Sequence, residues 1–292
     1  SQIPFWALTI YFFWKGINTK NITNWILFGI FSALGFLSKY LFIYILFSIF
    51  IYFILNIKRY KKYIANYILS VAISFVILIP HLVWLFKNNF VTIFYGLNRS
   101  SLIESTWINH LENPLIFIIN QIIILIPFLI MIFILFKKLN FKFNFKNRKT
   151  LFLISINLIP IALILITSIL SGAKIRTMWM TPFYLFFGTL FIEIFRKNID
   201  LKKIKNFYRI FLFLFILSPA AYLAVSIFDE QKRTDFPGKE IARLVQNKWN
   251  DNFANDIKIV VGDEWSAGNL SYHLESRPIW FNDLKNKASK VK

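Results

Sequence analysis

Residues 25–57 read WILFGIFSALGFLSKYLFIYILFSIFIYFILNI, and Lys39 is the only charged side chain among them. One helix of this length would measure roughly 50 Å at 1.5 Å per residue, whereas the hydrocarbon core of a bilayer is about 30 Å thick. We therefore expect a hairpin of two short spans, with its turn at Ser38, Lys39 and Tyr40. Small residues on the first arm suit close helix packing, and they would hold the lysine rigidly: Gly29, Ser32, Ala33 and Gly35.

The composition of the whole chain agrees with a membrane protein. Of its 292 residues, 57% are hydrophobic and 19% are aromatic, whereas soluble domains contain about 45–50% apolar residues. The sequence predicts an all-α polytopic membrane bundle of about eight spans, the first of them partial. Because that first run is short and the chain does not begin with Met, we expect an N-terminally truncated protein. The apolar runs lie at Ile3–Trp14, 22–38, 40–57, 64–86, 115–136, 150–170, 178–195 and 210–228.

The last part of the chain has a different character. Most of the 14 acidic residues lie in residues 229–292, and long apolar runs stop there. A helical period covers 236–249, and short β-rich runs lie at 257–262 and 277–281. We expect a transmembrane domain at 1–228, followed by a small extracytoplasmic α/β domain.

Basic residues predict the orientation of the bundle. They concentrate in the segments 58–62, 137–149 and 196–209, which fall on one side if the hairpin is present. The positive-inside rule assigns that side to the cytoplasm and places Lys39 and the C-terminal tail outside. Glu193, near the cytoplasmic end of its span, is interpreted as an ion pair with the basic residues that follow it. The topology accounts for the net charge of +20, so we expect no nucleic-acid partner.

A few basic residues remain at the outer boundary, where topology does not favour them. An anionic headgroup or phosphate is a natural partner for such cations, because Lys binds it as a point charge and Arg binds it bidentately. The alternative is that they only extend to the interface, which we favour for Lys87. The set is Lys39, Lys87, Arg99, Lys174 and Arg176.

Four segments resemble one group of enzymes. They are NWILFGIFSALGFLSKYLFIYILF (24–47), IPHLVWLFKNNFVTIFYGLNR (79–99), SGAKIRTMWMTPFYLFFG (171–188) and VVGDEWSAGNLSYHLESRPIWF (260–281). In this order they are similar to segments of bacterial GT-C membrane glycosyltransferases. The groups concerned are family 39, which is dolichyl-phosphate-mannose-protein mannosyltransferase-like, and the aminoarabinose-transferase-like enzymes.

The resemblance implies a polytopic enzyme of the bacterial inner (plasma) membrane. Such an enzyme moves a sugar from a polyprenyl-phosphate donor to a lipid, glycan or protein acceptor on the outer face, and we expect no metal or other cofactor. Family members carry a catalytic Asp or Glu in the first outer loop. That loop would precede Ser1, so no catalytic residue is assigned and the chain alone is expected to lack the catalytic base.

The candidate site residues follow from the outer cations and from this resemblance. We expect Lys39, Lys174 and Arg176 to bind the donor phosphate, with Arg99 and His81 as further contacts. Structural hydrogen bonding is an equal alternative for His81. Candidates close to the substrate are Tyr40, Glu104 and Trp179. The alternative for Glu104 is a solvated charge in a loop. For Asp263, which follows a β-rich run, we expect a structural role in a turn.

Two other classes of function stay open at this point. A transporter or lipid flippase would carry polar groups at the membrane midplane and often shows internal repeats, and neither feature is evident. A non-catalytic sensor or assembly protein, whose tail binds a partner, would tolerate loss of Lys39.

Overall fold

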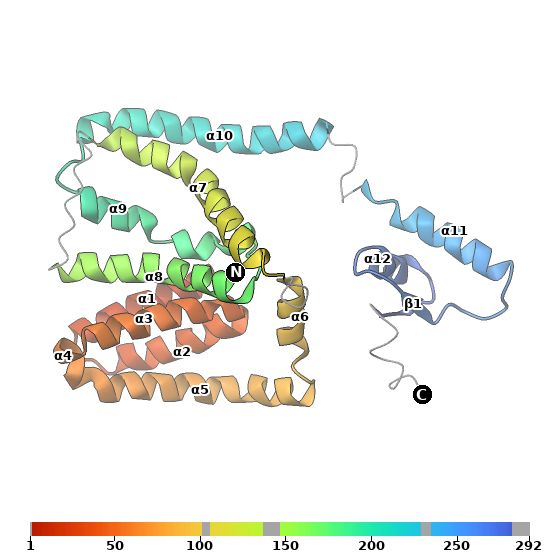
Figure 1. Cartoon of the computed structure of the whole chain (residues 1–292), viewed down its shortest axis with the longest axis horizontal. Helices are drawn as coiled ribbons and strands as arrows, with labels where there is room; N and C mark the ends of the chain where they lie inside the picture. Colours follow the sequence, from red (N-terminus) through yellow and green to blue (C-terminus); the bar gives the residue numbers. More distant parts are fainter. Residues whose placement is uncertain (1, 101–105, 137–146, 229–234, 282–292) are drawn as a thin grey trace. The chain divides into compact units, whose positions relative to one another are not determined.

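The computed structural model describes residues 2–100, 106–136, 147–228 and 235–281 (Figure 1). The chain divides into two compact units, residues 1–214 and 215–292. The division falls within helix α10, Ile204–Phe228, whose last residue is the end of the transmembrane domain expected from the sequence. Each unit is described by itself below.

The first unit is built from helices. They are α1 (Ile3–Asn18), α2 (Thr23–Ser38), η1 (Tyr40–Phe42), α3 (Ile43–Leu55), α4 (Ile57–Tyr60), η2 (Lys61–Tyr63), α5 (Ile64–Lys87), α6 (Val91–Arg99), α7 (Asn109–Leu135), α8 (Arg148–Ser171), η3 (Thr177–Trp179), η4 (Thr181–Tyr184), α9 (Phe187–Phe195), η5 (Leu201–Lys203) and the start of α10. Successive long helices run in alternating directions between two ends of the bundle (Figure 1). Helix α7 is curved and contains Pro114 and Pro127, which remove backbone donors and bend helices.

The expected hairpin turn is present at Lys39. Helix α2 ends there with an extended residue (φ −169°, ψ 131°), and the short 3₁₀ turn η1 leads into α3, which runs back (Figure 1). The arms of this hairpin pack mainly on other helices. Helix α2 packs against α1 and α5, whereas α3 packs against α8.

Close contact between α2 and α5 confirms the tight helix packing expected at Gly29. A Cβ added to Gly29 would lie 2.5 Å from the backbone oxygen of Ser70. At this approach Ser70 Oγ donates to the carbonyl of Trp25 at 2.8 Å, and Ser74 Oγ donates to the carbonyl of Gly29 at 2.7 Å. Small side chains and interhelical hydrogen bonds are the interactions that hold helices together in lipid.

Aromatic side chains fill the centre of the first unit. Phe13 is fully buried and packs at ring-centroid distances of 6.0 Å on both Trp25 and Phe152. The buried hydroxyl groups of Tyr52 and Tyr60 satisfy one another at 2.9 Å. Aromatic pairs of this kind contribute about 0.5–1.5 kcal/mol each beyond their buried area, so the abundance of Phe, Tyr and Trp supports the packing of these helices.

Among the residues that the structure describes, four helical segments are long and apolar enough to cross a membrane: Ile57–Lys87, Asn109–Leu135, Arg148–Ser171 and Leu201–Phe228. Shorter apolar helices lie at Thr23–Ser38, Tyr40–Leu55 and Thr181–Phe195.

The late span expected at 178–195 is not one continuous helix. It begins as the 3₁₀ turns η3 and η4, and only α9 is regular. Pro182 accounts for part of the irregularity, because proline cannot donate a backbone hydrogen bond. The irregular backbone before α9 is what forms one wall of the cavities described below.

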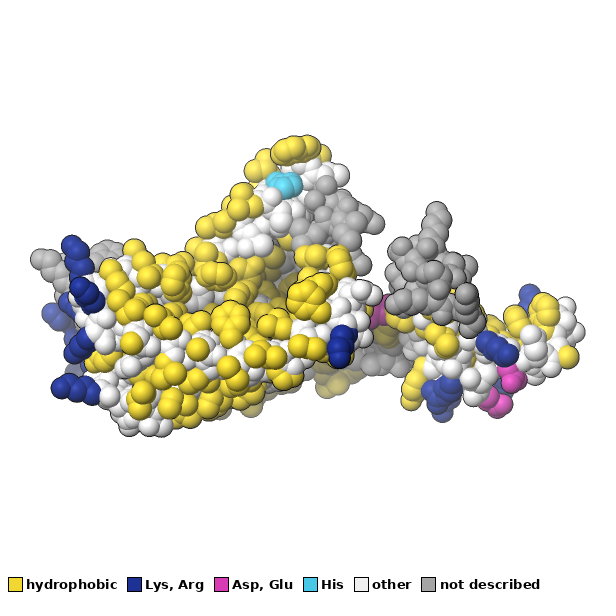
Figure 2. All heavy atoms as spheres, turned by 90° about the horizontal axis from the view of Figure 1, so that it is seen from below, with side chains coloured by type: hydrophobic (Ala, Val, Ile, Leu, Met, Phe, Trp, Pro, Cys, Tyr) yellow, Lys and Arg dark blue, Asp and Glu magenta, His cyan; other side chains and the backbone are white. Residues whose placement is uncertain are grey.

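Charged side chains gather at one end of the bundle. Figure 2 shows dark blue Lys and Arg side chains at one end of an apolar flank. Figure 1 places α4, the start of α8, the end of α9 and the start of α10 at that end. We call it the basic end. The turn between α2 and α3, which contains Lys39, and the end of α8 lie at the other end, which we call the far end.

The second unit has a small α/β arrangement. Its elements after α10 are α11 (Gly238–Asn250), β1 (Ile259–Val261), α12 (Ser266–His273) and β2 (Ile279–Phe281). The strands pair in parallel, with Val260 opposite Trp280, and α12 connects them. Buried side chains of all four elements or their flanks meet in one small core: Ala242, Ile257, Val260, Ala267 and Leu274, with Trp280 packed against it. The helix and both strands expected from the sequence are therefore present.

Candidate functional site

Lys39 lies at the far end, where α2 stops. Its ammonium nitrogen is 5.3 Å from the centre of the Trp179 ring, which belongs to η3. Partial burial lowers the pKa of Lys39 from its ordinary value, because desolvation disfavours the charged form. Among the described residues, the ammonium group is paired with a ring rather than with a carboxylate. A partly desolvated cation of this kind gains stability from an anionic ligand.

A polar network begins at the next residue. Tyr40 Oη is 2.9 Å from His81 Nε2 and 2.7 Å from Thr92 Oγ1. The His81 ring also stacks on Trp84, with ring centroids 6.0 Å apart. Tyr40 and Trp84 therefore hold the His81 ring in place. These contacts agree with structural hydrogen bonding, the alternative role considered for His81.

A strained turn brings Thr92 to this network. Between α5 and α6, Asn89 and Phe90 have φ values of 52° and 53°. The left-handed region is uncommon for a residue with a Cβ and costs on the order of 1–3 kcal/mol. The backbone N–H of Phe90 donates to the carbonyl of Leu85 at 2.9 Å, which holds the turn in place.

Lys174 and Arg176 line a cavity of about 340 Å³ between α7 and the chain that follows α8. Both side chains are exposed. Asn113 and Asn120 add amide groups to the same lining. Trp179 connects this cavity to Lys39, because its backbone N–H donates to the carbonyl of Arg176 at 3.0 Å. Three of the outer cations expected from the sequence thus lie around one short segment.

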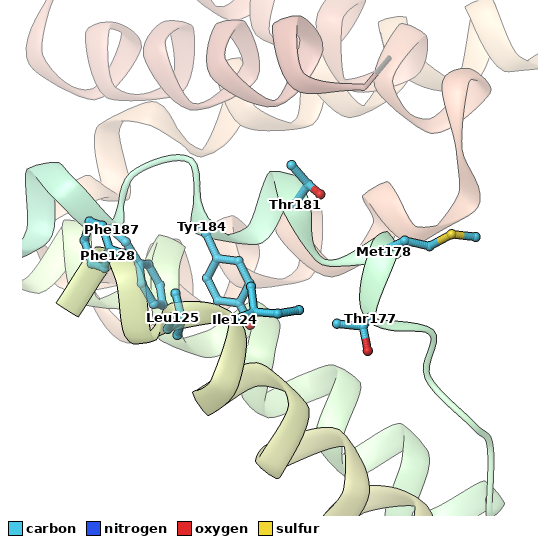
Figure 3. Close-up of a pocket in the computed structure, with 8 residues that line it drawn as sticks. All are labelled: Ile124, Leu125, Phe128, Thr177, Met178, Thr181, Tyr184 and Phe187. Carbon is cyan, nitrogen blue, oxygen red and sulfur yellow. The ribbon is translucent and has the colours of Figure 1, made fainter. Parts of the chain in front are cut away.

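An apolar cavity of about 470 Å³ adjoins the cationic one and shares Thr177 and Met178 with it. In Figure 3, side chains of α7 form one wall, and Tyr184 and Phe187 face them from the opposite segment. The full lining is Ile124, Leu125, Phe128, Thr177, Met178, Thr181, Tyr184 and Phe187.

The α7 residues of the two cavities follow one face of the helix. They recur at helical spacing from Asn113 to Phe128, which corresponds to roughly 22 Å at 1.5 Å per residue. The polar residues lie at the far end of this face and the apolar residues follow toward the basic end. We call the two cavities together the α7 groove.

The remaining candidate residues are not among the lining residues of the α7 groove. Arg99 ends α6 and lies 5.9 Å from the ring centre of Tyr95. The next residue, Ser100, accepts a hydrogen bond from the backbone N–H of Lys174 at 3.0 Å. Lys87 is exposed at the end of α5. Glu104 lies outside the described residues.

Sequence reasoning missed a polar pair beside the groove. Tyr184 Oη donates to Gln121 Oε1 at 2.5 Å, and Gln121 is buried within apolar α7. Asn113 and Asn120 were missed as well. A sequence signal existed, because an amide inside an apolar run is costly in a membrane and usually has a partner.

The arrangement is suited to hold an anion that carries a long apolar chain. Cations and amides lie at the far end of the α7 groove, and apolar side chains continue from them. The described lining residues include no carboxylate, so this geometry supports binding and charge stabilisation rather than general base catalysis. No group of three or more His, Asp or Glu that could hold a metal is present among the described residues.

Comparison with known proteins relates the N-terminal part of the chain to a protein family. Residues 1–84 match the family model described as dolichyl-phosphate-mannose-protein mannosyltransferase, and this part includes Lys39, Tyr40 and His81. No curated protein and no solved structure matches the chain. The match supports a glycosyltransferase of the GT-C type, and together with the apolar helices it indicates a multi-pass membrane protein.

Proposed function

We propose that this chain is a glycosyltransferase of the GT-C type and binds the sugar donor. It takes a sugar from a polyprenyl-phosphate donor and passes it to a lipid, glycan or protein acceptor on the outer face of a bacterial inner membrane. The observation that carries the proposal is the α7 groove, whose cationic end adjoins an apolar cavity. The family match over residues 1–84 supports the reaction class.

In this proposal the donor phosphate lies near Lys174 and Arg176, with Lys39 on the other side of Trp179. Arg can contact two phosphate oxygens at once, and each charge-assisted hydrogen bond contributes about 1.5–3 kcal/mol. The polyprenyl chain follows the apolar face of α7 past Leu125 and Phe128. These cations stabilise the leaving phosphate.

The orientation belongs to the same proposal. The basic end faces the cytoplasm, and the far end and the C-terminal tail face outward. The gathering of basic segments at one end supports this orientation through the positive-inside rule.

Binding of a polyprenyl phosphate tests the proposal without requiring sugar transfer. The purified chain is titrated with a short polyprenyl phosphate, and binding is followed by tryptophan fluorescence. Arg176→Ala and Lys39→Ala should each weaken binding by about 10- to 100-fold, which corresponds to about 1.4–2.8 kcal/mol. The matched control is Lys87→Ala, an exposed cation outside the groove, which should change binding by less than about twofold.

Two further ligands distinguish binding of the phosphate group from binding of the polyprenyl tail. A polyprenol without phosphate should bind equally to the wild type and to Arg176→Ala. Inorganic phosphate alone should bind weakly. Equal losses in Lys87→Ala and Arg176→Ala would contradict the site, and movement of the intact lipid between leaflets without sugar transfer would favour a flippase.

A further inference from the structure

A third cavity lies away from the α7 groove, toward the basic end. It has a volume of about 310 Å³ and lies between α1, α8 and α9. Its inner walls are apolar and include Phe152, Leu153 and Ile156 of α8. At about 30 Å³ for each water-sized group, the space accommodates roughly ten such groups, which is part of one acyl chain.

Three cations lie at or beside the lining of this cavity. Arg148 lies over the Trp14 ring with its guanidinium carbon 4.9 Å from the centre, and Lys15 lies over the Tyr11 ring at 5.3 Å. Both rings line the cavity, as does Lys149 itself. The three cations come from the last turn of α1 and the first turn of α8, so the fold brings together charges that are far apart in sequence.

One acidic residue also lines the cavity. The Glu193 carboxylate accepts hydrogen bonds from Asn147 Nδ2 at 3.1 Å and Thr150 Oγ1 at 3.5 Å. The ion pair that the sequence suggested with the basic residues after Glu193 is therefore replaced by these side-chain hydrogen bonds, because the start of α8 lies beside α9. Both donors are uncharged, so Glu193 keeps its negative charge, and the three cations outnumber this one carboxylate.

We infer that this cavity binds an anionic phospholipid of the leaflet at the basic end. The phosphate lies among Lys15, Arg148 and Lys149, and one acyl chain enters between Phe152 and Leu153. The first turn of α8 also favours an anion, because a helix N-terminus carries partial positive charge. Basic pockets between helices on the cytoplasmic side of a membrane protein bind anionic lipid headgroups in this manner.

Charge and shape together select this ligand. A soluble anion makes no use of the apolar walls, and a neutral lipid makes no use of three cations. The inference does not depend on the proposed enzyme activity, because the cavity shares no lining residue with the α7 groove.

Native mass spectrometry of the purified chain tests the inference. The protein is mixed with phosphatidylglycerol or phosphatidylcholine of identical acyl chains, and retained lipid is counted. The pocket variant carries Lys15→Gln, Arg148→Gln and Lys149→Gln. The control carries Lys58→Gln, Lys61→Gln and Lys62→Gln, which removes equal charge from exposed residues at the same end. The pocket variant should lose phosphatidylglycerol affinity by at least about tenfold and the control by less than about threefold.

A second variant tests the chain-binding part of the cavity. Leu153→Trp fills the space while all three cations stay, and it should also lower phosphatidylglycerol retention by about tenfold. Excess inorganic phosphate should not displace the lipid. Equal losses in the two triple variants would show general surface attraction and overturn the inference. Equal retention of phosphatidylcholine by the wild type would overturn it too, and circular dichroism verifies that each variant is folded.

Discussion

The two ends of the helical bundle carry the same types of cation in different surroundings. At the basic end, Lys58, Lys61 and Lys62 are exposed side chains of a short connecting segment. At the far end, Lys39 is partly buried against Trp179, and Arg176 lines a cavity. Many exposed charges orient a membrane protein without binding anything in particular, whereas a few charges at the edge of a cavity select a ligand. The number of charges therefore indicates topology, and their surroundings indicate function.

Labelling of single cysteines has the largest expected effect. It tests directly whether the two ends of the bundle lie on opposite sides of the membrane. The chain has no Cys, so Ser38→Cys at the far end and Asn18→Cys at the basic end are unique labelling sites. A membrane-impermeant maleimide should label Ser38→Cys in intact cells and Asn18→Cys only after permeabilisation. Asn250→Cys in the second unit should behave like Ser38→Cys. The reverse pattern would place the α7 groove on the cytoplasmic side and contradict the proposed outer-face reaction.

A pair of glycine variants tests whether the helices between the two ends are fixed by close packing. Gly29→Ala should lower the free energy of unfolding by about 1–3 kcal/mol, because the new methyl group meets the backbone of Ser70, which cannot easily move. Gly188→Ala is the matched control, since a Cβ there meets nothing within 4 Å, and alanine favours a helix by up to about 1 kcal/mol. Thermal unfolding in detergent measures both. Equal destabilisation would mean that the α2–α5 contact does not control stability.

The smallest expected effect concerns a charge in the second unit, where its role is local and structural. The Asp263 carboxylate accepts hydrogen bonds from the backbone N–H groups of Ser266 and Trp265 at 2.9 and 2.8 Å. These bonds lower the pKa of Asp263 below its ordinary 3.8, with the bond from Ser266 as the largest cause. The stabilisation is therefore present above pH 3.8 and is lost as the pH falls through the lowered pKa.

Hydrogen exchange in α12 measures this effect. In the wild type, protection at the start of α12 should fall in acid. Asp263→Asn keeps an acceptor and should remove the pH dependence, whereas Asp263→Ala should lower protection at every pH. An unchanged acid profile in Asp263→Asn would assign the pH dependence to another group.

Much of the helical framework could be predicted from the sequence because its apolar runs are long. The break at Lys39 was predicted from length alone, since one helix over 25–57 would be too long for a bilayer. The helix and strands of the second unit followed from periodicity and β-rich runs. The interruption before α9 was missed, because the apolar pattern continues through residues whose backbone is irregular.

The candidate site was predicted only in part. Lys39, Lys174 and Arg176 were selected because topology did not explain them, and Trp179 proved to be the residue that connects them. Asn113 and the pair of Gln121 with Tyr184 were not selected. Their importance depends on which face of α7 packs against the segment after α8. The sequence alone does not show which face that is.

The sequence by itself determined where most of the long apolar helices lie, where the chain reverses at Lys39 and at which end the basic residues gather, because these features depend on length, apolar content and charge along the chain. Only the tertiary structure decided which side chains share a cavity. Lipid and protein interior are equally apolar, so a hydrophobic helix face does not reveal whether it meets lipid or a neighbouring helix. The position of Lys39 over Trp179, and of Arg148 over Trp14, follows from packing alone.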